Sequence, residues 1–182
     1  RSSMLTGLYP SKTGVMGNIG QAGGPPLNIP TIGLALQKAG YRTAYYGKWH
    51  LGKNPIGIAG WDDEFGVSGS ETHDDTEVSR RAQQFLEKNQ NNIQPFALFL
   101  SYTNPHDIYR FDKEKEPKPN KKIKLPETWY NKEFSKVPAI QNQFMREDQG
   151  KVIVDLDSPA WERYREIYRE KVKLYDDEIG KV

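Results

Sequence analysis

The chain of 182 residues contains no cysteine, which excludes disulfide bonds and cysteine-ligated metal ions within it. It also lacks an uninterrupted apolar run of about 18 residues, the length that a membrane-spanning helix needs. Neither sign of charge is in large excess, because 26 Lys and Arg residues face 24 Asp and Glu residues. A net charge of +2 therefore gives no reason to expect a nucleic acid or a membrane as partner.

Apolar residues are scarce as well. A hydrophobic content of 36% and a mean hydropathy of -0.81 are low for a self-contained α/β domain, although a chain of this length can bury a sizeable core. The composition fits part of a domain that is rich in surface loops. Because the sequence begins with Arg rather than Met, we expect an internal piece of a longer protein, and the lack of a visible secretory signal is uninformative.

Helical and extended patterns alternate along the chain. Thr31 can cap a helix that Gly40 closes, and an extended run follows over residues 41–49. A second amphipathic helix is predicted over 76–89. The nearly continuous apolar run over 96–102 is typical of a strand that is buried on both faces of a parallel sheet. This alternation predicts an α/β fold.

Other segments are predicted to be loops, except at the end of the chain. Residues 11–29 are rich in Gly and Pro, residues 53–76 carry no clear period, and the Pro- and Lys-rich residues 107–150 are expected to form a long excursion with little regular structure. The basic and aromatic residues of this excursion would also suit nucleic-acid binding, but interleaved acids argue against it. A final helix is predicted from about Ala160 to the end, and its Asp176-Asp177 pair fits a structural role better than a metal site.

Lys48 and His50 stand at the end of the predicted strand over 41–49, with a Gly on each side. Residues two apart on a strand point to the same face. An ammonium and an imidazole on one face make an anion site that can also transfer a proton. The alternative is a surface Lys beside a His that packs against Trp49.

Three segments of the sequence match a known pattern in order. The opening Arg1-Ser2-Ser3-Met4-Leu5-Thr6-Gly7-Leu8-Tyr9-Pro10 resembles the second half of the sulfatase signature, Cys/Ser-x-Pro-Ser-Arg-x-x-x-Leu-Thr-Gly-x-x-Pro. The Gly-Lys-Trp-His-Leu-Gly run at 47–52 resembles the second signature of that family, and Asn104-Pro105-His106 resembles a Pro-His element after a strand. The chain is therefore identified as similar to the sulfatases of the alkaline-phosphatase superfamily.

The resemblance implies a fold and a set of cofactors. It implies an α/β sandwich with a mainly parallel central sheet flanked by helices, of which residues 1–182 would form the middle portion of the N-terminal catalytic domain. The nucleophile would be a formylglycine, made from a Cys or Ser four positions before Arg1 and so upstream of this chain. A divalent cation, usually calcium, would be held by ligands that lie mostly outside this segment, and no metal ligand is expected within it.

The resemblance also implies roles for individual residues. Arg1 would hold the formylglycine, Lys48 would bind a sulfate oxygen, and His50 would help to break down the sulfated intermediate. His106 would contact the sulfate or the bridging oxygen and is the candidate acid for the leaving group.

Weaker candidates for substrate binding lie nearby in the sequence. Ser70 follows the Gly60-Trp61-Asp62 element, where some sulfatases place a sulfate-contacting Ser, and Asn104 and Asp107 flank the Pro-His element and could touch a sugar hydroxyl. A cluster at His73, Asp74 and Asp75 could bind a metal but fits a polar loop better. Aromatic platforms for a sugar are available at three positions, Trp61, Tyr109 and Trp129.

The resulting functional prediction is a sulfuric ester hydrolase. The parent protein would cleave sulfate esters of a carbohydrate or small organic molecule, with help from formylglycine-generating machinery, and family analogy suggests a periplasmic or secreted protein. The isolated chain is expected to be inactive. Two alternatives stay open: a formylglycine-dependent phosphodiesterase or phosphonate monoester hydrolase, and a sulfatase-like binding protein without catalysis.

Overall fold

A computed structural model of the chain describes residues 1–19, 25–52, 60–67, 75–112, 114–115, 123–130 and 136–182. The chain divides into two compact units. The first comprises Arg1–Thr103 together with Asp177–Val182, and the second comprises Asn104–Asp176.

The first unit is built around a sheet of three parallel strands, β1 (Arg42–Lys48), β2 (Asp63–Val67) and β3 (Phe96–Ser101), in the order β2-β1-β3. The parallel sheet and its flanking helices confirm the predicted α/β fold. The prediction of a continuous loop over 53–76 is wrong at β2. This strand has only five residues and no apolar run, and it forms because the backbone of β1 offers a pairing edge rather than because of a local pattern.

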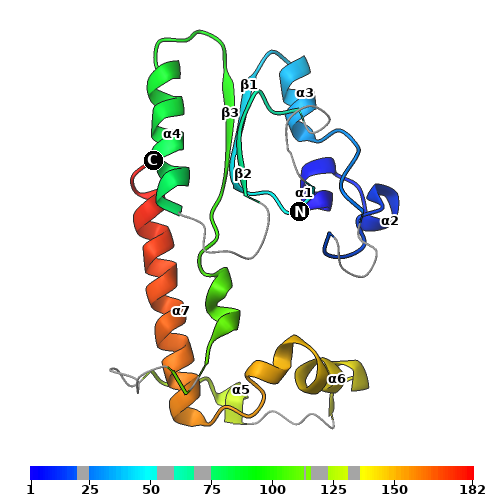
Figure 1. Ribbon diagram of the computed structural model, residues 1–182, viewed down its shortest axis with the longest axis vertical. Helices are drawn as coiled ribbons and strands as arrows, with labels where there is room; N and C mark the ends of the chain where they lie inside the picture. Colours follow the sequence, from blue (N-terminus) through cyan, green and yellow to red (C-terminus); the bar gives the residue numbers. More distant parts are fainter. Residues whose placement is uncertain (20–24, 53–59, 68–74, 113, 116–122, 131–135) are drawn as a thin grey trace. The chain divides into compact units, whose positions relative to one another are not determined.

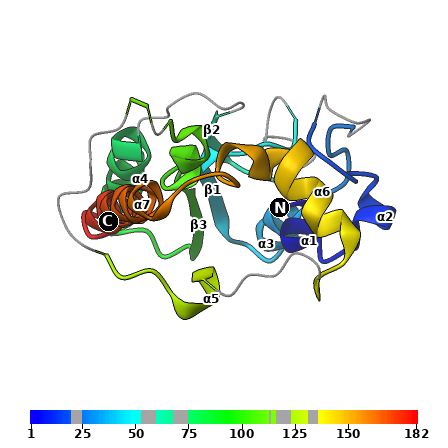
Figure 2. The same ribbon diagram turned by 90° about the horizontal axis from the view of Figure 1, so that it is seen from below.

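Helices cover both faces of this sheet (Figures 1 and 2). On one face, Ala44 and Tyr46 pack against the apolar side of α4 (Asp75–Asn89). On the other face lies Tyr45, and the core there is completed mainly by residues from outside the strands, Leu5, Val15, Trp49, Leu51 and Trp61. The helices α1 (Ser2–Thr6), α2 (Pro10–Thr13) and α3 (Ile32–Lys38) lie on this second side. The alternation of apolar contacts along β1 follows from the two-residue period of a strand.

The predicted helices before and after β1 are confirmed, and their ends have the expected chemistry. The Thr31 hydroxyl accepts a hydrogen bond from the amide of Gly33 at 3.1 Å, which caps α3. Gly40 has a φ of 87° and takes the chain out of the helix towards β1. The strand β3 is half-buried. The prediction that this strand is buried on both faces is therefore wrong for the chain alone.

The second unit is mainly helical. It contains the short helices η2 (His106–Arg110), α5 (Glu127–Tyr130), α6 (Ala139–Glu147) and η4 (Gln149–Val152), and most of α7 (Ser158–Ile179). Its core is formed by Ile108, Phe111, Leu156 and Ile167. The described part of 107–150 is thus more regular than predicted. The Pro- and Lys-rich composition indicated a loop, although short apolar pairs such as Ala139-Ile140 and Phe144-Met145 support the helix α6.

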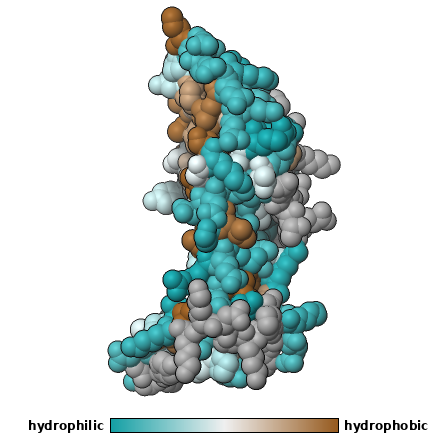
Figure 3. Space-filling model, turned by 90° about the vertical axis from the view of Figure 1, so that its left-hand side faces the viewer, coloured by the Kyte–Doolittle hydropathy of each residue, from teal (hydrophilic) through white to brown (hydrophobic). Residues whose placement is uncertain are grey.

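The final helix α7 confirms the predicted helix at the end of the chain. Ile167 of this helix is buried. Four other large apolar or aromatic residues of the helix are more than one-third exposed, namely Tyr168, Val172, Leu174 and Ile179. The face of the molecule in Figure 3 accordingly shows hydrophobic patches between hydrophilic side chains. Within the described ranges, no helix combines the length and the apolar character needed to cross a bilayer.

Candidate active site

The carboxyl end of β1 is shaped by Gly47. This residue lies opposite Gly66 of β2 and Ser101 of β3 and has a φ of 105°. A Cβ atom at this position would stand 2.1 Å from the carbonyl oxygen of Ser101. Only glycine combines this backbone angle with so close an approach, so Gly47 lets the neighbouring strand pass directly beside the start of the site.

Lys48 is the last residue of β1 and is only 4% exposed. Its carbonyl oxygen accepts a hydrogen bond of 2.7 Å from the hydroxyl of Tyr45. The Tyr45 ring in turn packs on the rings of Trp49 and Trp61, with centroids 5.1 and 5.4 Å away. The backbone at Lys48 is therefore fixed by a buried aromatic cluster.

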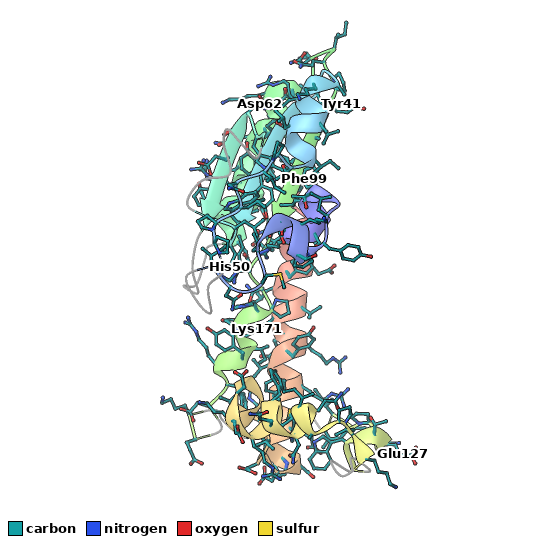
Figure 4. All side chains as sticks on the ribbon, turned by 90° about the vertical axis from the view of Figure 1, so that its right-hand side faces the viewer. Tyr41, His50, Asp62, Phe99, Glu127 and Lys171 are labelled. Carbon is teal, nitrogen blue, oxygen red and sulfur yellow. The ribbon has the colours of Figure 1, made fainter. Side chains whose placement is uncertain are left out.

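His50 follows the strand and has a left-handed φ of 56°. Because β1 ends at Lys48, His50 is not part of the strand. The prediction that the two side chains share one face of a strand is therefore wrong. The two side chains still interact: burial, and then the charges of Lys48 and Arg1, lower the pKa of the His50 imidazole from its ordinary 6.5. Figure 4 shows His50 at the end of the sheet opposite Tyr41 and Asp62.

Arg1 precedes α1 and is exposed, yet its charge reaches this same end of the sheet. It contributes to the lowered pKa of His50 and opposes the burial that raises the pKa of Tyr45. The short helix after it is anchored because Leu5 is buried in the aromatic cluster around Tyr45. The first and second sequence motifs are therefore adjacent, and Arg1, Lys48 and His50 form a group of basic side chains suited to an anion.

The third motif follows β3. The amide of Thr103 donates a hydrogen bond of 2.8 Å to the buried carboxylate of Asp75, the first residue of α4. The Asn104-Pro105 peptide bond is cis, and His106 then begins η2 in the second unit. The His106 ring stands edge-on to the ring of Tyr109, with centroids 5.1 Å apart.

The structure describes two of the three weaker candidates for substrate binding. Both carboxylate oxygens of Asp107 lie 2.9 Å from the Lys171 ammonium, so this side chain links η2 to α7. Asn104 is half-buried beside the cis bond. Their contact with a sugar stays a prediction. Ser70, His73 and Asp74 lie outside the described residues.

Aromatic and metal-binding candidates can also be placed. Trp61 is 2% exposed and belongs to the core, so it offers no platform to a sugar, whereas Tyr109 is 45% exposed. No three acidic or imidazole side chains among the described residues are grouped so that they would hold a metal ion. The described residues therefore do not form a site for a divalent cation by themselves.

The lowered pKa of His50 leads to a direct prediction. Replacing Lys48 by Met removes one of the positive charges, so the pKa of His50 should rise towards 6.5. Nuclear magnetic resonance can follow the titration, because the sequence has only three His residues. Lys38→Met, at the end of α3, is the matched control and should leave the pKa unchanged. A pKa that stays fixed in Lys48→Met would show that the two groups are not coupled.

The sulfatase family model matches residues 1–182, which is the whole chain. The chain belongs to the sulfatase family. Arylsulfatase G of Rattus norvegicus is 43% identical over 72 residues, which cover 37% of this chain and 14% of that sulfatase. The sulfatase YidJ of Escherichia coli is 28% identical over 142 residues, covering 58% of this chain and 28% of the relative.

The fold of the chain also agrees with that of solved sulfatases. A structure described as a 2-O GAG sulfatase superposes with a TM-score of 0.76 at 19% identity, covering 100% of this chain and 42% of that chain. This similarity shows the fold, a parallel α/β arrangement that the chain shares with a solved sulfatase. The chain spans less than half of that structure and a smaller share of the curated relatives it matches.

The sequence did not single out Tyr45 as a support of the site. Its alternation with neighbouring apolar residues indicates only a core position. The hydrogen bond to the carbonyl three residues later depends on how the strand ends, and this bend has no local sequence signal apart from Gly47 and Gly52.

Proposed function

We propose that the protein containing this chain hydrolyses sulfate esters. The observation that carries the proposal is that two separate sequence motifs pack together at the carboxyl end of β1, where Leu5 shares a core cluster with Trp49, the residue between Lys48 and His50. The charges of Lys48 and Arg1 also contribute to the lowered pKa of His50. Fixed cations in a partly dry site stabilise the charge on the non-bridging oxygens of a reacting sulfate. The carboxyl edge of a parallel sheet is also where open α/β folds place their ligands.

Each side chain would have a distinct task. The buried Lys48 ammonium would bind a sulfate oxygen as a point charge. His50, kept neutral by its lowered pKa, can accept a proton when the sulfated intermediate breaks down. His106 would donate a proton to the leaving oxygen, and Arg1 would orient the nucleophile. Ser70, Asn104 and Asp107 are proposed as secondary contacts to the substrate.

Sulfatases in general use formylglycine and a divalent metal ion. We propose calcium for this protein, held by acidic ligands from parts of the protein outside this chain, which would be the middle portion of its catalytic domain. Formylglycine would supply a hydrated aldehyde as the nucleophile. An exported protein, periplasmic or secreted, is proposed by analogy with the family.

A carbohydrate sulfate is the proposed substrate. Two relatives from Bacteroides thetaiotaomicron carry names that specify sugars, an N-acetylglucosamine-6-O-sulfatase that is 28% identical over 123 residues and a Delta 4,5-hexuronate-2-O-sulfatase that is 27% identical over 121 residues. The second candidate is a phosphodiester or phosphonate ester hydrolase, since phosphate and sulfate esters need similar cationic sites. The third is a binding protein that lacks turnover.

The test is an assay of the protein encoded by the whole gene, produced together with formylglycine-generating machinery and supplied with calcium. We expect release of sulfate from para-nitrophenyl sulfate and from sulfated monosaccharides, and much slower cleavage of bis-para-nitrophenyl phosphate. Faster cleavage of the phosphate diester would favour the second candidate, and no turnover of any ester would favour the binding protein. The 182-residue chain alone is expected to release no sulfate.

A further inference from the structure

A pocket of about 430 Å³ lies beside η2 within the second unit. Phe111 and Leu156, both buried, form its apolar base, and Tyr109 and Val152 line it with 45% and 43% of their surfaces exposed. This size lies in the range of ligand pockets in proteins. An aromatic ring and an aliphatic side chain at an open rim suit the carbon-bound hydrogens of a sugar ring.

The polar part of the pocket is balanced in charge. Its charged lining residues are Arg110, Asp112, Glu114, Lys151 and Asp155. The ammonium of Lys115, which is not a lining residue, stands 2.9 Å from Asp112 and lowers the pKa of that carboxyl through their hydrogen bond. With it, three cations and three carboxylates lie in or beside the described lining. Such a rim does not attract a polyanion, but it provides both acceptors and donors for the hydroxyl groups of an uncharged sugar.

A neighbouring pocket lacks this charge pattern among its described lining residues. That pocket has about 370 Å³ and is lined by Trp129, Met145, Trp161 and other residues, and none of its described lining residues is charged. It would suit an apolar group, whereas the pocket beside η2 suits a ligand with many hydroxyl groups.

Tyr109 connects the pocket to the third motif. Its ring contacts the ring of His106, at 5.1 Å between centroids. Tyr109 also lines the pocket, where the Arg110 Nε atom donates a hydrogen bond of 3.2 Å to the Tyr109 hydroxyl and the guanidinium lies 5.7 Å from the ring centroid. A ligand in the pocket is therefore separated by one side chain from the imidazole proposed to act on the sulfate ester.

We propose that this pocket binds an uncharged saccharide unit that is joined to the sulfated unit of the substrate. The inference rests on the proposed function, because it takes His106 as a residue of the active site. It narrows the substrate to a sulfated oligosaccharide or polysaccharide with an unsulfated neighbour, and it makes Tyr109 a residue that determines specificity.

The first experiment compares substrates that differ by one neutral sugar. In the active protein, kcat/KM is measured for sulfated N-acetylglucosamine, for the same unit within N-acetyllactosamine, and for para-nitrophenyl sulfate. We expect the disaccharide to be favoured about tenfold over the monosaccharide, the effect of one good aromatic contact. Tyr109→Ala should remove this advantage, so that the disaccharide and the monosaccharide then have similar kcat/KM values.

Two further variants separate pocket filling from disturbance of His106. Val152→Trp places a large ring in the pocket from a residue outside η2 and should abolish the disaccharide advantage as well. Tyr168→Ala removes a tyrosine of matched exposure, 44%, that is not among the residues lining the pocket, and should change nothing. Equal kcat/KM for monosaccharide and disaccharide, or an equal loss on all substrates in Tyr109→Ala, would overturn the inference.

Binding without turnover distinguishes this inference from the proposed function. Unsulfated N-acetyllactosamine and lactose are titrated into the protein, and chemical shifts are followed by nuclear magnetic resonance. We expect saturable shifts at Tyr109 and Val152 that are lost in Val152→Trp. Absence of these shifts alongside normal sulfate release would overturn the saccharide pocket alone, whereas saturable shifts without any sulfate release would overturn the proposed hydrolysis alone.

Discussion

Lys48→Ala is expected to lower kcat/KM for sulfate ester hydrolysis about 100- to 1,000-fold, the range seen when one fixed oxyanion-stabilising group is removed. Lys48 is only 4% exposed as a residue, so we expect little water to screen its charge from a bound sulfate. Its backbone is held by a hydrogen bond from the Tyr45 hydroxyl. Initial rates on para-nitrophenyl sulfate measure the effect.

Two further variants test whether the effect is specific to the charge and shape of Lys48. Lys38→Ala removes a lysine from the last turn of α3, away from the carboxyl end of β1, and should retain the parental rate. Lys48→Arg keeps the charge but has a longer, planar head, so we expect a partial loss. A Lys48→Ala protein that is folded and turns over at the parental rate would remove Lys48 from the proposed mechanism.

Gly47→Ala should destabilise the protein by about 3 to 5 kcal/mol, the upper range for a single substitution. The new methyl group would meet the Ser101 carbonyl at 2.1 Å, and a φ of 105° is itself strained for alanine. Relief requires β1 and β3 to separate at the point where the site begins. Urea-induced unfolding, followed by tryptophan fluorescence, gives the change in free energy.

The control for this substitution is Gly40→Ala. Gly40 also has a positive φ, of 87°, but nothing lies within 4 Å of where its Cβ would be. It should therefore show only the cost of the backbone angle, about 1 kcal/mol. Equal destabilisation in the two variants would mean that the close approach of β3 contributes nothing, contrary to the register of the strands.

The helices α3, α4 and α7 and the strands β1 and β3 were predictable from sequence because each carries its own period or cap. Thr31 and Gly40 define α3, and the period of α4 reflects the face it buries. The strand β2 was not predictable, since Asp63–Val67 has a mixed composition and depends on pairing with β1. The apolar run of β3 predicted more burial than the chain provides.

The roles of the site residues stay predictions, but the placement of these residues can be compared with what the sequence indicated. Lys48 and His50 interact as expected, but through a bend after the strand rather than along a pleated face. The nearness of Arg1 follows from the burial of Leu5, a tertiary contact that no local pattern contains. The pairing of Asp107 with Lys171 joins residues 64 positions apart, and no local sequence pattern indicates it either.

The lowered pKa of His50 has a consequence for how substrate and protons arrive. Lys48 and Arg1 disfavour the imidazolium while the site holds no anion. A sulfate group seated among these charges offsets their repulsion, so the imidazole gains affinity for a proton as the anion binds. By linkage, protonation strengthens anion binding to the same degree. The cluster would thus hold inorganic sulfate more tightly in acid, and product inhibition would deepen as the pH falls.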